Sequence, residues 1–389
     1  FLNCYFDTPN LDTNFQQLIK DKSTDFSRYT YFYANYLLKK NNLQKANLVL
    51  ENQLQKRPGN LLLNQLKKDI KLKKKNYLQN NFDCKNISHI TAEIYYITAN
   101  ALSSQTLYAL SNFYLNLAKY LNQDFHSYNS LLAENFYMTE NYKEAKKVYL
   151  VLKKIGEVYS WHSSKQIALI DIENGNNDLA LNTIQKSYQS LKKPDVYQTY
   201  DFANFLKNNE KFDRSIKFYT KLIKKISQKH ELYPKAKDGR GIAFEQLDKW
   251  KQAEKDFLDS LRAKPNQAYV MNYLAYSWIE KGINIDKSLM MLERANKLRS
   301  NDGYIIDSLG WALFKLKKYG EAKRYLQKAV KLMPADPIVN DHFADALWMN
   351  GKKIQARYYW NYVLNLEKTK TDLKNNINIK ILNGPILLN

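Results

Sequence analysis

The sequence predicts an all-α solenoid built from repeated pairs of antiparallel helices. A small residue recurs at intervals near 34 residues, and a second small residue follows twelve positions later, or thirteen in one repeat. A period of this length is typical of two-helix repeats, and two helices approach closely only where neither carries a large side chain. Gly (11) and Pro (8) are scarce for 389 residues, which favours long helices over turn-rich β-structure. The first series is Ala34, Ala99, Ala133, Ala168, Ala203, Gly241, Ala275, Gly310 and Ala344, and the second is Ala46, Ser111, Ala145, Ala180, Ser215, Ala253, Ser288, Ala322 and Ala356.

The N-terminal part is the least regular. Within residues 1–26, apolar side chains at helical spacing over 11–18 predict one short helix. The first repeat then covers 27–60, with helices over 29–40 and 43–55. A Pro-Gly pair just beyond the second helix marks its end.

Residues 61–75 are expected to form one strongly basic amphipathic helix, and the Asn-rich stretch 76–91 an irregular segment. From residue 92 the pattern is continuous, with repeats that begin near 92, 126, 161, 196, 234, 268, 303 and 337. Extra residues around 227–233 are expected to lengthen a second helix or its exit loop.

The repeat at 303–336 shows how the pattern works. Its apolar residues stand at i, i+3 and i+4 spacing, as on a buried helix face. Gly310 and Ala322 stand where the two helices face each other, Tyr319 fills the corner between them, and Ala329 faces the next repeat. Pro334 ends the second helix because proline lacks an amide hydrogen and its ring clashes inside a helix.

These five residues together resemble the tetratricopeptide repeat (TPR), and a similar set recurs in the repeat that begins at 234. The resemblance covers most of 27–366. It implies a right-handed superhelical solenoid of antiparallel helix pairs. The expected segments are an N-terminal segment with a short helix (1–26), degenerate helical repeats (27–125), a TPR array (126–366), and a capping helix with a tail (367–389).

A narrower resemblance lies near the C-terminal end. The runs NYLAYSW (272–278), DGYIIDSLGWALFKL (302–316) and NDHFADALW (340–348) resemble bacterial TPR proteins of the cell envelope. Some members of that group are adaptors that bring a periplasmic protease together with its substrates. The resemblance implies a non-catalytic scaffold in the periplasm or at the outer membrane; a cytoplasmic location is the alternative. The chain begins with Phe1 instead of Met, so we expect a fragment or a processed form.

The resemblance also implies where a partner polypeptide binds. In such arrays the first helix of each repeat, helix A, lines the concave surface with its second, fifth, ninth and twelfth positions. Aromatic faces there offer contact area at little entropic cost, and Asn or Asp side chains offer hydrogen bonds; the acids favour a basic or polar partner. Packing between successive helices is the alternative for Trp311, Phe314 and Trp348. The predicted partner-binding residues are Tyr269, Asn272, Tyr276, Tyr304, Asp307, Trp311, Asp341, Asp345 and Trp348.

No set of residues indicates catalysis, a cofactor or a metal ion. Asp341 and Asp345 share a helix face, but His342 is one position off it and no third convergent ligand is apparent. There is no glycine-rich phosphate loop. No apolar run approaches the roughly 20 residues needed to cross a bilayer.

The net charge of +22 raises an alternative function. A basic chain attracts nucleic acid or anionic membrane surfaces, and the lysines of 67–75 share a helix with a row of leucines. Those leucines are expected to pack on the preceding repeat, and no nucleic-acid motif accompanies the charge. Cys4 and Cys84 are too few for a disulfide framework. One bond between them would suit an oxidising compartment, and two buried free thiols are the preferred interpretation.

Overall fold

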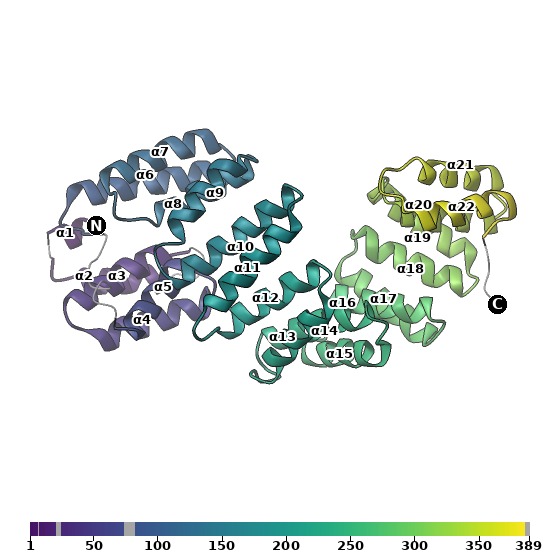
Figure 1. The fold of residues 1–389 in the computed structure, drawn as a ribbon, viewed down its shortest axis with the longest axis horizontal. Helices are drawn as coiled ribbons and strands as arrows, with labels where there is room; N and C mark the ends of the chain where they lie inside the picture. Colours follow the sequence, from purple (N-terminus) through teal and green to yellow (C-terminus); the bar gives the residue numbers. More distant parts are fainter. Residues whose placement is uncertain (7, 21–24, 74–81, 386–389) are drawn as a thin grey trace. The chain divides into compact units, whose positions relative to one another are not determined.

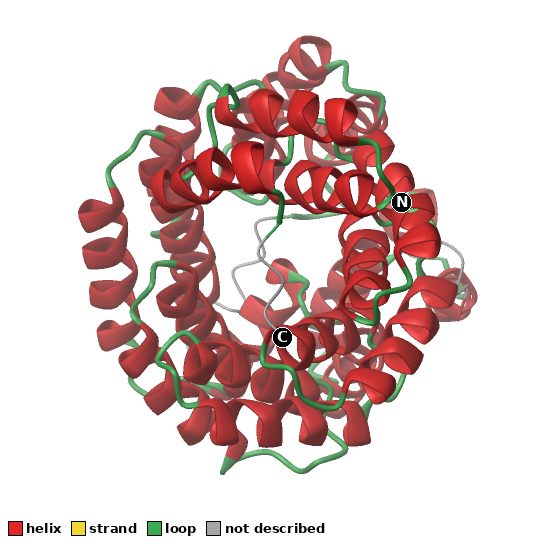
Figure 2. Cartoon of the chain, turned by 90° about the vertical axis from the view of Figure 1, so that its right-hand side faces the viewer, coloured by secondary structure: helices red, strands yellow, loops and turns green. Residues whose placement is uncertain are grey.

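The computed structural model describes residues 1–6, 8–20, 25–73 and 82–385. All regular secondary structure among these residues is helical (Figure 2). The chain divides into two compact units, Phe1–Gln198 and Thr199–Asn389, and the division falls within helix α12 (Val196–Asn208). The fold class predicted from the sequence is confirmed.

The helices of unit 1 follow the predicted repeats, with two shifts: α10 begins at Glu157, four residues before the expected repeat at 161, and α6 is also early. Helix α6 begins at Ile87, five residues before the expected repeat, because the Asn86 side chain accepts a hydrogen bond from the Ser88 amide and caps the helix there. The helices are α1 (Leu2–Tyr5), α2 (Leu11–Lys20), α3 (Ser27–Lys39), α4 (Leu43–Lys56), α5 (Leu61–Lys71), α6 (Ile87–Ser104), α7 (Tyr108–Leu121), α8 (Tyr128–Met138), α9 (Tyr142–Leu152), α10 (Glu157–Glu173) and α11 (Asn177–Ser190).

The basic helix expected over 61–75 is α5, which ends at Lys71; residues 74 and 75 lie outside the described part of the chain. Its apolar side packs inside unit 1, as expected, because Leu63, Leu66 and Ile70 are buried. Lys68 of the same helix forms an ion pair with a glutamate of α10. The apolar side of this helix is therefore part of the core of unit 1.

Unit 2 continues as a stack of helix pairs (Figure 1). Of the extra residues expected near 227–233, residues 227–231 lie in the connection between α13 and α14, and the last two begin α14; the expected capping helix is α22. The helices after α12 are α13 (Phe212–Ile223), α14 (Leu232–Glu245), α15 (Trp250–Ala263), α16 (Ala268–Glu280), α17 (Ile285–Leu298), α18 (Gly303–Lys315), α19 (Tyr319–Leu332), α20 (Pro337–Met349), α21 (Lys353–Leu364) and α22 (Thr371–Asn383).

The small residues lie where the two helices of a pair meet. All eighteen predicted positions are buried. A Cβ added to Gly310 would stand 2.6 Å from the Leu326 Cγ atom of the paired helix. In the α6–α7 pair, the Ser111 hydroxyl donates to the Ala99 carbonyl at 2.8 Å. Close contact between helices thus explains the period that the sequence displays.

The turn between the helices of a pair has its own regularity, which the sequence did not reveal. One residue there adopts the left-handed backbone conformation in repeat after repeat, at φ between 51° and 77°. Glycine occupies it at Gly175 and Gly351, whereas Thr106, Glu140 and Lys317 adopt it elsewhere. A left-handed residue at this point ends helix A and lets helix B turn back on it.

Candidate functional site

The predicted binding residues lie on one side of α16, α18 and α20, the helices A of three successive repeats. We call this side the A-helix face: the second, fifth, ninth and twelfth positions of these helices. The second positions are open to solvent, with Tyr269, Tyr304 and Ile338 exposed by 53%, 59% and 44%. These three side chains form the accessible row of the face.

The deeper positions of the A-helix face are closed to different degrees. Asn272, Tyr276 and Trp348 are half-buried. Four residues of the predicted set are buried, namely Asp307, Trp311, Asp341 and Asp345. The structure therefore places the nine predicted residues on one face but leaves only part of them accessible.

His342 organises the middle of the face. Its Nδ1 atom lies 3.0 Å and 3.1 Å from the two carboxylate oxygens of Asp307, and its ring stacks on Trp311 with centroids 4.0 Å apart. Trp311 in turn donates its indole N–H to Glu280 at 2.6 Å. These contacts join α16, α18 and α20 into one layer.

The charge state of His342 follows from its neighbours. Burial alone would lower the pKa of this imidazole, but the Asp307 carboxylate beside it outweighs burial, and the net effect raises the pKa above its usual value. Asp341 and Asp345 act in the same direction. The protonated ring is thus the form that this environment favours.

The two acids of α20 are paired with the C-terminal helix. Lys380 of α22 places its Nζ atom 2.9 Å and 2.8 Å from the Asp341 oxygens and 2.9 Å from an Asp345 oxygen. The Trp360 indole N–H also donates to Asp341 at 3.0 Å. Burial, reinforced by the Asp341 carboxylate, raises the pKa of Asp345 to about 7.

This pairing changes two expectations from the sequence. The idea that the acids of this face attract a basic partner does not hold for Asp341 and Asp345, because both are buried and Lys380 already forms ion pairs with them. For the aromatic residues, the packing alternative applies to Trp311 and Phe314, whose rings stack at 4.8 Å and are both buried. These residues hold the face together.

Half-buried polar and aromatic groups remain on the same face. The Asn272 Oδ1 atom is buried and has no hydrogen-bond partner among the described residues. Trp348 packs on Trp360 at 5.5 Å, while Lys353 and Arg357 lie over its ring at 5.2 Å and 5.0 Å. The Asn272 oxygen is thus an unpaired acceptor beneath the surface of the face.

Sequence reasoning missed Glu280, His342 and Lys380 as partners in this layer. His342 could have been found from the repeat register, because the sixth position of one helix A faces the fifth position of the preceding one. Lys380 gave no such signal, since it lies in the capping helix beyond the last repeat. The described residues contain no group of three or more His, Cys, Asp and Glu side chains placed to hold a metal ion.

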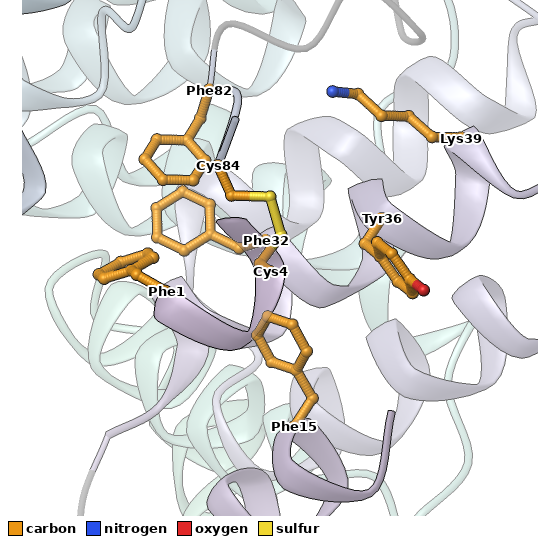
Figure 3. A pocket seen from close by; sticks show the side chains of 8 residues that line it. All are labelled: Phe1, Cys4, Phe15, Phe32, Tyr36, Lys39, Phe82 and Cys84. Atoms are coloured by element: carbon orange, nitrogen blue, oxygen red, sulfur yellow. A yellow bond between two sulfur atoms is a disulfide. The ribbon is translucent and has the colours of Figure 1, made fainter. Parts of the chain in front are cut away.

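A second feature lies in unit 1, where Cys4 and Cys84 form a disulfide (Figure 3). The preferred expectation of two free thiols is therefore wrong. The bond joins α1 to the segment before α6, and Phe1, Phe32 and Phe82 pack together beside it, with Phe32 and Phe82 stacked at 4.1 Å. The adjoining cavity has a volume of about 30 Å³, which is about the space of one water molecule.

In the described part of the chain, no helix is long and apolar enough to span a membrane.

Comparison with known proteins agrees with this fold. Residues 304–336 match the family model described as "Tetratricopeptide repeat", which is the repeat predicted at 303–336. A "TPR repeat-containing protein" of Pseudomonas aeruginosa is 28% identical over 95 residues, which cover 24% of this chain and 16% of that protein. The matched stretch thus spans about a sixth of that relative's length.

Solved structures with similar folds include a tetratricopeptide repeat protein from Parabacteroides merdae, at 14% identity and a TM-score of 0.46 over 57% of this chain and 85% of that one. The type IV pilus biogenesis factor PilW is 15% identical with a TM-score of 0.43, over 49% of this chain and 85% of that one.

Proposed function

We propose that this chain, in which residues 304–336 match the tetratricopeptide-repeat model, is a non-catalytic scaffold that binds a partner polypeptide on the A-helix face of residues 268–349. The observation that carries the proposal is the accessible row. Tyr269, Tyr304 and Ile338 are large apolar side chains that stand exposed at the same position of three successive helices. A row of this kind matches an extended segment or a helix of a partner.

The chemistry of the row suits a polypeptide. The two tyrosines provide wide contact surfaces with few rotatable bonds, which keeps the entropic cost of binding low. Tyr269 is also held in place, because its hydroxyl donates to Asp302 at 2.8 Å and Arg299 lies over its ring at 4.7 Å.

The buried members of the predicted set have a positioning role in this proposal. Asp307 and Trp311, through His342, keep α18 and α20 in fixed register, and Asp341 and Asp345 do the same for α20 and α22. A rigid face lowers the ordering cost that binding would otherwise incur.

We further propose that the scaffold works in the bacterial cell envelope, as an adaptor for an envelope protein such as a protease or its substrates. The Cys4–Cys84 disulfide supports this location, because such bonds persist in oxidising compartments such as the periplasm. Rapid acid quenching of cells followed by alkylation of free thiols tests it. Both cysteines should resist the label until a reductant is added, and labelling without reductant would contradict the envelope location.

Affinity capture from a native envelope extract tests the binding face. The informative variant is Tyr269→Ala with Tyr304→Ala, because both side chains are exposed and their loss leaves the core intact. Tyr358→Ala with Tyr362→Ala is the matched control, since these exposed tyrosines lie on the second helix of a pair. Changing Asp307 and Trp311 instead would test folding as well as binding.

Proteins that the parent and the control retain, and the Tyr269/Tyr304 variant loses, would identify the partner. Partners retained equally by all three chains would place the site elsewhere. Retention of nucleic acid that moderate salt removes would transfer the function to the lysine surface, because phosphate contacts weaken steeply with salt.

A further inference from the structure

The helix A that precedes the A-helix face carries an acid without a partner. This helix is α14, and Asp238 occupies the fifth position of its repeat, which begins at residue 234. The side chain is half-buried, and no described residue forms a hydrogen bond or an ion pair with its carboxylate. Its oxygen atoms are not enclosed by the protein, unlike the Asn272 oxygen. Asp238 is thus an unpaired charge that a ligand can reach.

The fifth position of helix A carries an acid in two other repeats of unit 2, and each of these acids has a basic neighbour. Asp307 lies beside His342, and Asp341 forms an ion pair with Lys380. In both repeats the basic side chain comes from a later element of the chain. Asp238 is the acid at this position for which the described part of the chain supplies no such group.

The residue in the next repeat explains this difference. His342 occupies the sixth position of the helix A that follows Asp307, and the corresponding residue after Asp238 is Tyr273. The Tyr273 hydroxyl donates to Glu245 instead, which joins α16 to α14. The repeat that follows Asp238 therefore places an aromatic side chain where the later repeat places a basic one.

The surroundings of Asp238 suit a cation. Burial raises the pKa of the Tyr200 hydroxyl to about 12, and the Asp238 carboxylate acts in the same direction, so the two groups are near enough to interact. Tyr273 is also under the influence of this carboxylate. Both tyrosines are half-buried. Tyrosine rings attract ammonium and guanidinium groups, and the carboxylate supplies the opposite charge.

Unit 1 shows how such surroundings hold a cation. The Arg28 guanidinium pairs with the Glu93 carboxylate at 2.5 Å and lies 3.8 Å from the centre of the Tyr96 ring. At Asp238 the carboxylate and the tyrosines are present, but the described chain provides no cation to pair with them.

We propose that Asp238 binds a lysine or arginine side chain of the partner polypeptide, with Tyr200 and Tyr273 beside the bound cation. In this proposal, which rests on the proposed function, the polypeptide lies along the helices A of unit 2 and is basic where it passes α14. A basic partner, which Asp341 and Asp345 do not require, is thus favoured by an acid outside the predicted set.

Two lysines of unit 2 are the alternative partners of Asp238. Lys207 of α12 is the positive group that acts on its carboxylate, and Lys235 stands three residues before it on α14. Neither forms an ion pair with it. Asp238→Asn should therefore leave the urea midpoint unchanged or raise it, because no ion pair is lost. A lower midpoint would assign Asp238 to these lysines and overturn the proposal, since breaking a buried pair is strongly destabilising.

An array of short peptides from bacterial envelope proteins, probed with the full chain, tests the binding. Each peptide is presented twice, once unchanged and once with every lysine and arginine replaced by glutamine. The informative variant is Asp238→Asn. The matched control is Asp286→Asn, which removes the same charge from an exposed position in the first turn of α17. The Tyr269/Tyr304 variant reports separately on the proposed function.

We expect the parent and the Asp286→Asn chain to bind basic peptides about tenfold more tightly than their glutamine counterparts, because charge-assisted hydrogen bonds are the stronger kind. The Asp238→Asn chain should lose this preference and bind the glutamine peptides as the parent does. The net charge of +22 would by itself favour acidic peptides, so a preference for basic ones points to a local acid.

Two kinds of failure are distinguishable. If the parent binds both forms of each peptide equally, or if the preference survives in the Asp238→Asn chain, this inference is overturned and the proposed function stands. If the parent binds no peptide, or if the Tyr269/Tyr304 variant binds peptides as well as the parent does, the proposed function fails, and this inference fails with it.

Discussion

Replacing Lys380 should strongly destabilise unit 2. Its ammonium group is the sole counter-charge within 3 Å of two buried carboxylates, Asp341 and Asp345, in the described part of the chain. The substitution Lys380→Met keeps most of the aliphatic stem of this side chain and removes its charge. Two carboxylates that are 5% and 2% exposed then face each other without an ion-pair partner, and His342 is the positive group that still acts on both.

The magnitude follows from that geometry. Breaking a buried ion pair by removing one partner costs about 3–5 kcal/mol, because the remaining charge stays out of water. One carboxylate can reduce this cost by binding a proton, and the pKa of Asp345 is already raised to about 7 by its burial. The loss should therefore be larger at pH 8 than at pH 5.5.

Urea unfolding followed by tryptophan fluorescence measures this loss. Of the six tryptophans, Trp161 alone lies in unit 1, so the signal reports mainly on unit 2. The control is the triple change Asp341→Asn, Asp345→Asn and Lys380→Met. It removes all three charges and keeps an acceptor for the Trp360 indole, so it should recover most of the loss. If the free energy of unfolding of the single Lys380→Met variant lies within about 1 kcal/mol of that of the parent at pH 8, the reasoning is refuted.

Three further predictions follow from the packing and the charges. Ala322→Leu should cost about 1–3 kcal/mol, because Ala322 is fully buried between paired helices; an unchanged thermal midpoint would contradict the assigned register. Cys4→Ser with Cys84→Ser should lower the stability of unit 1 by about 2–4 kcal/mol, because the bond closes a loop of 80 residues. Urea denaturation checks this: adding a reductant should lower the stability of the parent and leave that of the variant unchanged. The pKa of His342 is raised in the folded chain. The stability that its protonated ring contributes is therefore complete below pH 6.5 and is lost as the pH rises through the pKa of the folded state. As the pH rises above 6.5, the thermal midpoint of unit 2 should fall in the parent, and it should fall by a smaller amount in the His342→Gln variant.

The fold was predictable because close helix packing leaves a direct mark on the sequence. Ala34 and Ala46, like Gly310 and Ala322, must be small for paired helices to meet, so the period is visible in one chain. The turn between the helices has no comparable pattern in the sequence. Its left-handed residue is glycine in some repeats but Glu140 in another, because the conformation is tolerated by other side chains at a moderate cost.

The candidate site was predictable only as a face, because accessibility depends on residues in the next repeat. The fifth position of helix A is Asn272, Asp307 or Asp341 in successive repeats. Asn272 keeps an unpartnered oxygen, Asp307 is closed by His342, and Asp341 is closed by Lys380. The same register position thus keeps an unpartnered oxygen in one repeat and is closed by a neighbouring side chain in the next two. A period locates each side chain on its helix, but the chemistry of its neighbour 35 to 39 residues later decides whether a partner can reach it.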